Sequence, residues 1–325
     1  MAQPIRGRLA GQRGGALTVP RGPFPLCEAD VSVKCRIISD DDPERLHGLR
    51  ADSFFSGGDL HVNDRVGFWR FGQEDVASVR RSTFVRWVEH HATVASTNTR
   101  ALAVAADNSW HVPALIVADE QTEGRGRGAN RWWSAPGCLT CSLVLGTDGE
   151  EASINGTRVS LTAGLAVSAA LQQLCPALPV GLKWPNDVFI RARKVCGILV
   201  EVPPRVVGRV VVGIGVNVNN PMADSGLASA TSLVDEVGYR FELTRVLIAI
   251  LRQLEDHLKL LAPQEERLAS CWRAYCMLTG NTVRVQAGSN HTVGVCRGID
   301  ANGALLVETS RGVQQCLTGA VSIVS

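Results

Sequence analysis

The chain has 325 residues, of which 45% are hydrophobic, and a formal net charge of +2. These values fit one large domain plus a small one with a buried core, and the near-neutral charge does not favour a nucleic-acid binder. No apolar stretch reaches the roughly 18 residues that span a bilayer, and the N-terminus lacks the apolar segment of a secretory signal. Ten cysteines without a repeated spacing are typical of reduced thiols, so the sequence predicts a cytoplasmic protein that binds no membrane.

The N-terminal quarter of the chain divides into two segments. Residues 1–25 hold four arginines, five glycines and four prolines but no acidic residue, a composition that predicts a disordered basic tail. Residues 26–82 lack the two amphipathic helices and short turn of a DNA-binding winged helix, and their role stays open. The main domain is predicted to start at residue 83, with a first strand over Phe84–Glu89. Deletion of residues 1–82 is therefore expected to leave a soluble protein.

Apolar runs and helical periodicities follow one another through residue 276. Predicted strands cover residues 114–118, 139–145, 188–190, 195–202 and 209–218, and predicted helices cover residues 99–106, 159–174 and 243–261. This order predicts an α+β domain over residues 83–276, a mixed β-sheet with packed helices. Short runs separated by turn residues then cover 282–285, 293–296, 304–307 and 321–324. They predict a small β-barrel over residues 277–325.

The most informative stretch is Asp119–Gly137, which follows the apolar run of residues 114–118. In Gly124-Arg125-Gly126-Arg127-Gly128, glycines that allow close backbone approach alternate with two arginines suited to carboxylate or phosphate. Trp132 and Trp133 are large enough to lie along a planar ligand. A flexible Arg-Gly tail is the alternative, but such tails repeat and do not lie between two apolar strands. The stretch predicts a binding loop for a small anionic ligand.

Two further groups suggest metal or redox chemistry but have simpler interpretations. Cys138 and Cys141 form a single C-x-x-C within a predicted strand, and no second pair or histidine lies at a fitting spacing. His90-His91 also lack partners at ligand spacing. We therefore predict buried structural thiols in the first case and surface histidines at a strand end in the second.

Four motifs in one order resemble those of biotin protein ligases. They are the loop with Gln121, Gly124–Arg127, Trp132 and Ser134–Gly137, followed by Lys183–Asp187, Arg193–Glu201 and Gly213–Asn219. The resemblance covers about residues 85–275, and the C-terminal strands resemble the SH3-like cap of bacterial members. It implies the class II synthetase-like catalytic fold shared by biotin and lipoate ligases. The loop departs from many bacterial members, because Gly128-Ala129-Asn130 stands where further basic residues are common.

The resemblance implies an ATP-dependent ligase with Mg²⁺ as cofactor. Such an enzyme activates biotin as biotinyl-5′-AMP and transfers it to a lysine of a biotin carboxyl carrier protein or domain. A homodimer stays open. Lipoate or octanoate ligases share the fold but lack the Gly-Arg-Gly-Arg loop. A biotin-sensing transcriptional regulator with retained ligase activity would need a helix-turn-helix, which the sequence does not show.

The chemistry and the resemblance together suggest site residues. Arg127, Lys183 and Lys194 would stabilise the phosphoryl charge, and Asp187 would hold Mg²⁺ or position the incoming amine. The resemblance places these residues against biotin: Ser96, Thr97, Asn98, Gln121, Arg125, Gly126, Arg127, Lys194 and Gly197. The expected nucleotide contacts are Gly124, Arg125, Arg127, Trp132, Lys183, Asn186 and Asn217. Ser96 and Thr97 also fit the N-cap of the following helix.

Overall fold

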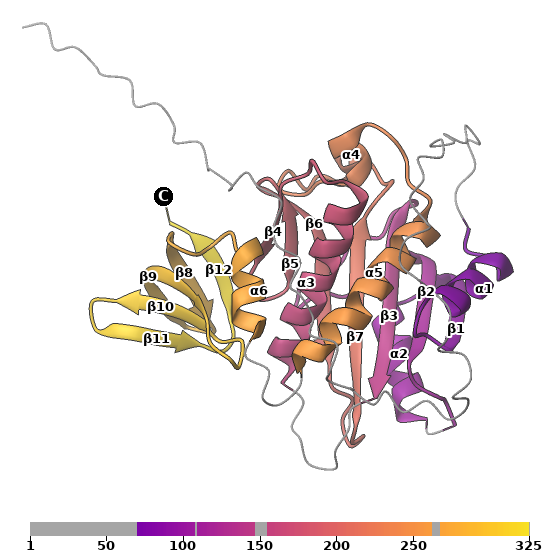
Figure 1. The fold of residues 1–325 in the computed structure, drawn as a ribbon, viewed down its shortest axis with the longest axis horizontal. Coiled ribbons are helices and arrows are strands. Elements are labelled where there is room, and N and C mark those ends of the chain that lie inside the picture. Colours follow the sequence, from indigo (N-terminus) through magenta and orange to yellow (C-terminus); the bar gives the residue numbers. More distant parts are fainter. Residues whose placement is uncertain (1–69, 108, 147–154, 262–266, 325) are drawn as a thin grey trace, which may run out of the picture.

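The computed structural model describes residues 70–107, 109–146, 155–261 and 267–324. The predictions for residues 1–69, including the disordered tail, lie outside these ranges. The described chain forms a seven-stranded sheet flanked by helices and a second, five-stranded sheet at the C-terminal end (Figure 1). None of the described helices has the length and apolar character needed to cross a membrane.

The large sheet is mixed, as predicted from the sequence. Its strand order is β1-β2-β3-β7-β6-β5-β4; β1 and β2 run parallel and every other neighbouring pair is antiparallel. The strands are β1 (Trp87–Val94), β2 (Ala114–Gln121), β3 (Cys138–Gly146), β4 (Val180–Lys183), β5 (Asp187–Ile190), β6 (Arg193–Glu201) and β7 (Arg209–Asn217). The first strand was predicted over Phe84–Glu89, but β1 begins only at Trp87. Phe84 and Val85 are buried in the core just before it.

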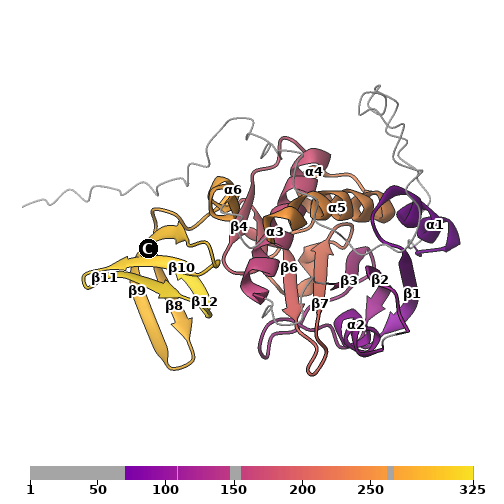
Figure 2. The ribbon, with the colours of Figure 1, turned by 60° about the horizontal axis from the view of Figure 1, so that its bottom comes forward.

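Helices cover both faces of this sheet (Figure 2). On one face lie α3 (Gly156–Leu174) and α5 (Leu243–His257), and the opposite face carries α2 (Thr97–Ala106). Alternate residues of β2 pack on opposite faces of the sheet. Leu115 and Val117 belong to the larger core, whereas Ile116 packs with the alanines of α2. This alternation is what a strand buried on both faces requires.

The structure places a helix before residue 83, the predicted start of the main domain. Helix α1 (Gln73–Ser82) packs on the main domain, and Phe71 and Val79 belong to its core. The backbone N–H of Phe71 donates to Asp119 (3.2 Å), and the hydroxyl of Thr244 donates to Asp75. A polar helix with few apolar positions gives a weak periodic signal, so the sequence missed it. We propose that the catalytic unit begins near residue 70, and that deleting residues 1–82 would remove part of its core.

Replacing Val79 with alanine in the full chain should lower the free energy of unfolding by about 1–3 kcal/mol, because Val79 is fully buried between α1 and the domain. Urea unfolding would measure the change. Val207, which is 70% exposed, provides the control, since its replacement by alanine removes little buried surface. Equal midpoints for the two variants would show that α1 is not part of the cooperative unit.

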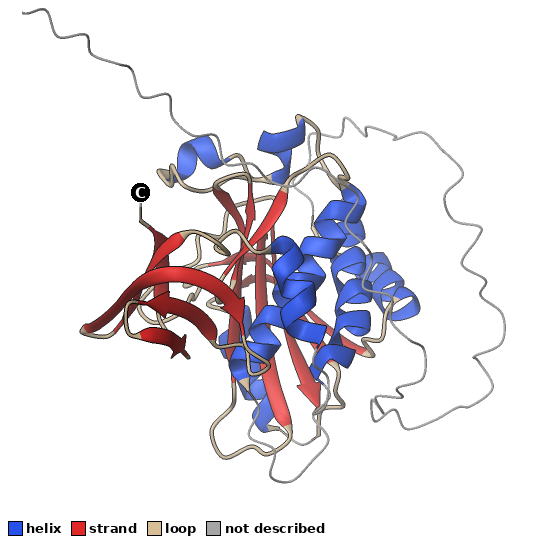
Figure 3. Ribbon diagram, turned by 60° about the vertical axis from the view of Figure 1, so that its left-hand side comes forward, coloured by secondary structure: helices blue, strands red, loops and turns tan. Residues whose placement is uncertain are grey.

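The C-terminal sheet has the strand order β11-β10-β9-β8-β12 and is antiparallel throughout. Its strands are β8 (Thr282–Ala287), β9 (Asn290–Ile299), β10 (Leu305–Thr309), β11 (Gly312–Cys316) and β12 (Ala320–Ile323). The main domain contacts this sheet at the turn before β10. The Trp184 indole N–H donates to the Gly303 carbonyl (3.0 Å), and the Arg158 guanidinium donates to the Ala301 carbonyl (2.9 Å). Trp184 directly follows β4, so the C-terminal sheet contacts the main domain beside the end of that strand. Figure 3 shows the C-terminal strands as a separate group next to the large sheet.

Four short elements were not predicted, and one predicted helix ends earlier than expected. Strand β4 and helix α6 (Arg267–Tyr275) were not predicted, and β11 has mostly exposed side chains without an apolar alternation. The predicted final helix of residues 243–261 ends as α5 at His257 and continues as the 3-10 helix η3 (Leu258–Leu261). Helix α4 (Leu233–Val237) has five residues, which is too short for a periodic pattern.

Candidate active site

A cavity of about 480 Å³ opens on the α2 face of the large sheet. It is bounded by the start of α2, the loop after β2, the β4–β5 hairpin, the segment after β7 and the start of β12. Of the residues predicted to form the site, these line it: Ser96, Thr97, Asn98, Gln121, Arg125, Gly126, Arg127, Trp132, Lys183, Asn186, Asp187, Lys194, Gly197 and Asn217. The fold thus brings together side chains from segments more than a hundred residues apart in the sequence.

Two cross-strand glycines make the floor of the cavity flat. Gly197 of β6 and Gly215 of β7 are direct partners in the sheet, and the indole of Trp132 lies over both. A Cβ added at Gly215 would stand 2.4 Å from Trp132 Cε2, and one added at Gly197 would stand 3.2 Å from its Cζ3. Glycine is therefore needed in mid-strand so that a planar group can lie directly on the backbone.

Replacing Gly215 with alanine should displace the Trp132 ring, because a Cβ at 2.4 Å overlaps the indole. We expect a cost of about 1–3 kcal/mol in stability, typical of overpacking, together with weaker ligand binding. Thermal unfolding and ligand titration measure the two effects. Gly156→Ala is the control, since its Cβ would meet only Val200 at the ordinary distance of 3.7 Å. If both variants behave like the wild type, the ring does not depend on the glycine floor.

A neutral polar cluster lies at the N-terminus of α2. The backbone N–H of Thr97 donates to Gln121 Oε1 (2.7 Å), which also lies 3.1 Å from the Thr97 hydroxyl. Ser142 Oγ donates to Asn98 Oδ1 (2.6 Å) and lies 2.8 Å from Thr97 Oγ1. Ser96 occupies the N-cap position, although its side chain makes no capping hydrogen bond. These buried donors and acceptors, held in fixed orientations, suit a neutral polar ligand group.

A charged cluster lies around the β4–β5 hairpin. Lys183 and Asp187 are direct cross-strand partners, so the Lys-Trp-Pro-Asn-Asp motif is the turn that joins the two strands. Asp187 Oδ1 pairs with Lys194 Nζ at 2.6 Å, and the Lys183 ammonium lies over the Phe189 ring at 5.5 Å. Two cations and one carboxylate therefore converge on the cavity, as a site for anionic oxygen atoms requires.

Arg127 reaches the same end of the cavity. Its Nη1 lies 3.3 Å from both Asn186 Oδ1 and the carbonyl oxygen of Gly319, just before β12. Burial lowers the pKa of the Arg127 guanidinium, and the negative charge of Asp187 opposes this shift. An arginine stays charged under such conditions, so Arg127 presents a half-buried cation with neutral hydrogen-bond partners. Such a group can turn toward a phosphate without first breaking an ion pair.

Arg125 is held differently from Arg127. Its guanidinium makes a two-point ion pair with Glu201 at the end of β6, with Nη2–Oε1 at 2.7 Å and Nη1–Oε2 at 3.0 Å. The predicted direct contact of the Arg125 side chain with biotin or nucleotide would have to compete with this pair. Glu201 ends the third motif, but no local pattern indicates its partner 76 residues away in the sequence.

Lys194 is fixed by its backbone as well as by Asp187. Its N–H donates to the carbonyl of Ser229 (2.8 Å), and its carbonyl accepts from the N–H of Thr231 (2.9 Å). Residues 229–231 thus add a short parallel pairing to the start of β6. Ser229 and Ala230 also line the cavity, so this segment forms the wall next to Lys194.

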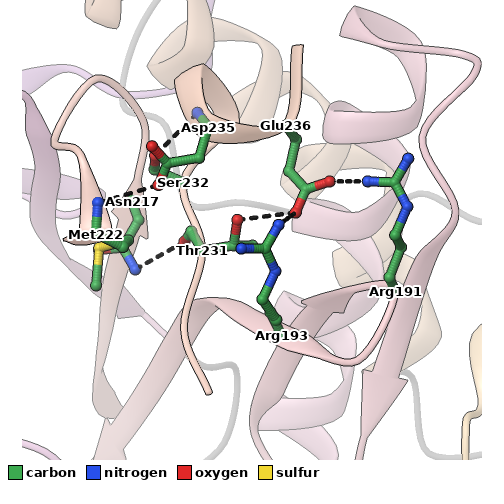
Figure 4. A network of polar contacts seen from close by, with 8 residues as sticks. All are labelled: Arg191, Arg193, Asn217, Met222, Thr231, Ser232, Asp235 and Glu236. Atoms are coloured by element: carbon green, nitrogen blue, oxygen red, sulfur yellow. Dashed lines mark hydrogen bonds and ion pairs between the residues drawn. The ribbon is translucent and has the colours of Figure 1, made fainter. Parts of the chain in front are cut away.

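The buried carboxylate of Glu236 stabilises that wall (Figure 4). The Glu236 side chain has no exposed surface and pairs with Arg191 and Arg193, and the Thr231 hydroxyl donates to it (2.8 Å). Arg193 directly precedes Lys194 in β6. The network thereby joins α4, the cavity wall and the strand that carries Lys194.

Two residues predicted to contact the nucleotide take part in hydrogen bonds within the chain. Gly124 does not line the cavity, because its backbone pairs with Trp132 and an added Cβ would lie 2.3 Å from the Trp132 carbonyl oxygen. Asn217 lines the cavity, but its amide already bonds the Thr231 carbonyl (3.1 Å) and Asn220 (3.0 Å). Gly124 therefore shapes the loop, and Asn217 also holds the wall.

The histidine pair and the cysteine pair lie in two different strands of the large sheet. His90 and His91 lie within β1 and face Asp119 and Glu89. Cys138 and Cys141 are buried in β3, and burial raises the pKa of both thiols to about 12. Both cysteines are therefore protonated at neutral pH and poorly reactive.

Two parts of the chain match known protein families. The model of the Biotin/lipoate A/B protein ligase family matches residues 91–219, and that of the Biotin protein ligase C terminal domain matches residues 279–323. The chain is 34% identical over 221 residues to Biotin--[acetyl-CoA-carboxylase] ligase of Mycobacterium tuberculosis, covering 67% of this chain and 81% of that protein. It is 31% identical over 238 residues to the enzyme of the same name from Paracoccus denitrificans, covering 67% and 93%.

The fold agrees with these matches. A solved structure, biotin protein ligase from Aquifex aeolicus in complex with biotin and ATP, has a TM-score of 0.64 at 28% identity, covering 74% of this chain and 100% of that one. The chain is also 30% identical to the Bifunctional ligase/repressor BirA of Bacillus subtilis, covering 72% of this chain and 73% of that protein. The chain is 34% and 31% identical to two ligases and covers 81% and 93% of their lengths. It therefore belongs to the biotin protein ligase family.

Proposed function

We propose that this protein is a biotin–[carboxylase] ligase. The observation that carries the proposal is a single cavity that holds both a neutral polar cluster and a cationic cluster. Biotin joins a neutral ureido ring to a carboxylate, and ATP brings the phosphates. The relatives named Biotin--[acetyl-CoA-carboxylase] ligase and the Aquifex structure with biotin and ATP support this choice of substrates.

In the first step, we propose that Thr97, Asn98 and Gln121 hold the ureido ring. The biotin carboxylate attacks the α-phosphorus of ATP, and the bond to pyrophosphate breaks. Negative charge spreads over the phosphoryl oxygens, where Arg127, Lys183 and Lys194 would stabilise it. These three cations line the same cavity and are already oriented by the contacts described above.

In the second step, the ε-amine of a lysine on a biotin carrier domain attacks the acyl carbon of the mixed anhydride. The bond between the acyl carbon and the AMP oxygen breaks, and AMP leaves with the electron pair. Asp187 would position the amine, since it is the carboxylate among the residues that line the cavity. The carrier domain would approach the mouth of the cavity between the loop after β2 and β12.

We propose Mg²⁺ as the metal of the first step. Within the described residues, no group of three or more His, Cys, Asp and Glu side chains is arranged to hold a metal ion. The carboxylate that lines the cavity, Asp187, fits Mg²⁺, which is commonly bound through one or two carboxylates plus substrate phosphates. Asp187 would supply the carboxylate, and the ion would neutralise phosphate charge.

Biotin-dependent exchange of pyrophosphate into ATP tests the function. We expect exchange with biotin and Mg²⁺, little exchange with lipoate or octanoate, and none without the metal. Exchange that is equal with lipoate, or absent with biotin, would contradict the assignment. A biotin-sensing regulator is tested separately by gel shift at physiological salt, because non-specific DNA binding weakens steeply with salt.

A further inference from the structure

The charge pairing of the two loop arginines is unequal. Arg125 makes a two-point ion pair with the carboxylate of Glu201, whereas the hydrogen-bond partners of Arg127 are the amide of Asn186 and the carbonyl of Gly319. Two-point arginine–carboxylate pairs are among the stronger polar contacts and fix orientation as well as distance. The Glu201 pair therefore holds the loop at Arg125 and leaves Arg127 for an incoming anion.

Glu201 also reaches the polar cluster at the start of α2. Its Oε2 accepts from Asn98 Nδ2 at 2.9 Å, and the same amide donates to the carbonyl of Leu199 at 3.2 Å. Asn98 is buried, and its other amide atom accepts from Ser142. These two acceptors fix the orientation of the Asn98 amide group. Glu201 therefore helps to set how Asn98 is presented to the cavity.

These contacts form one continuous chain. It runs from Arg125 through Glu201 to Asn98, and from there through Ser142 and Thr97 to Gln121. Its first member lies in the loop, and three of the others, Asn98, Thr97 and Gln121, are the residues proposed to hold the ligand ring. Its inner members Asn98, Ser142 and Thr97 are buried, whereas the Arg125 side chain is 43% exposed. Buried polar contacts of this kind are rigid when every member is satisfied. The loop and the ring pocket are thus joined by side chains rather than by backbone alone.

We propose that Glu201 is a positioning residue that fixes the loop of residues 124–132 over the polar cluster. It acts through Arg125 on one side and through Asn98 on the other. The part of this inference that concerns biotin rests on the proposed function. The part that concerns the loop rests on contacts within the chain and can be tested without any ligand.

Limited trypsin digestion of the full-length protein tests the loop. Trypsin cleaves after arginine, and the loop contains Arg127 and Arg131 besides Arg125. Cleavage follows the population of the open loop when opening and closing are fast. Losing a charge-assisted pair should raise that population about tenfold to a hundredfold. We expect Glu201→Ala and Arg125→Ala to be cut faster at Arg127 or Arg131, with the sites identified by mass spectrometry.

A double-mutant cycle separates this mechanism from general damage. If Glu201 acts on the loop through Arg125, the variant with both replacements should be cut no faster than either single variant. Glu201→Gln keeps an acceptor for Asn98 and should fall between the wild type and Glu201→Ala. Glu308→Ala, which breaks an exposed arginine–glutamate pair with Arg297 in the C-terminal sheet, is the matched control and should leave loop cleavage unchanged.

Steady-state kinetics then test the link to the ligand. We expect Glu201→Ala to raise the KM for biotin about tenfold to a hundredfold and to leave the KM for ATP close to the wild-type value. Unchanged loop cleavage in Glu201→Ala, or rate increases that multiply in the double variant, would overturn the inference. Absence of biotin-dependent exchange in the wild type would instead overturn the proposed function, and the digestion result would still decide the role of Glu201.

Discussion

Replacing Arg127 with glycine should give a protein that still forms biotinyl-adenylate but releases it. The half-buried guanidinium has neutral partners and faces the same cavity end as Lys183 and Lys194. A charge-assisted contact with the adenylate phosphate is worth about 1.5–3 kcal/mol. Its loss should therefore weaken retention of the intermediate about tenfold to a hundredfold. The two lysines remain to support the first step in part.

The measurement is biotin labelling of a bystander protein such as albumin, compared at matched adenylate production. Released adenylate reacts with exposed lysines, so the variant should label albumin more strongly than the wild type. Arg311→Gly removes an exposed arginine in the turn between β10 and β11 and controls for lost charge. If the Arg127 variant retains its adenylate as tightly as the wild type, Arg127 is not the phosphate contact. One of the lysines would then take that role.

Much of the fold follows from local sequence patterns. The apolar runs in β2, β3 and β7 are buried on both faces, so hydrophobicity alone marks them as central strands. The mixed sheet and the family were predicted correctly from these runs and the four motifs. Helix α1 was missed because its apolar positions are few, although the core requires it.

The candidate site was predictable where its residues lie in recognisable motifs. The cavity contains nearly all of them, because they lie at the start of α2, in the loop after β2, in the β4–β5 hairpin and along β6 and β7 around one cavity. Pairings across the chain could not be predicted in this way. Nothing in the local sequence indicates that Arg125 pairs with Glu201, or that Ala320 and Val321 of the C-terminal sheet complete the wall. Such contacts depend on tertiary packing rather than on periodicity.

The second large effect concerns the buried carboxylate behind Lys194. Replacing Arg191 and Arg193 together with alanine should lower the free energy of unfolding by about 3–5 kcal/mol, because it leaves the fully buried charge of Glu236 without a cation. Urea unfolding measures this change through the midpoint and slope. The reverse change, Glu236→Ala, should cost less. Both arginines are about half exposed, and water can solvate them once the carboxylate is gone.

A third variant distinguishes buried charge from lost packing. Adding Glu236→Gln to the double arginine variant removes the charge, keeps the shape and keeps an acceptor for Thr231. We expect it to recover part of the lost stability. Arg297→Ala is the control, since its partner Glu308 is 45% exposed and the pair should contribute at most about 1 kcal/mol. If the triple variant is no more stable than the double one, the cost comes from the arginine side chains themselves. The wall next to Lys194 would then be held by packing and by its backbone pairing to β6.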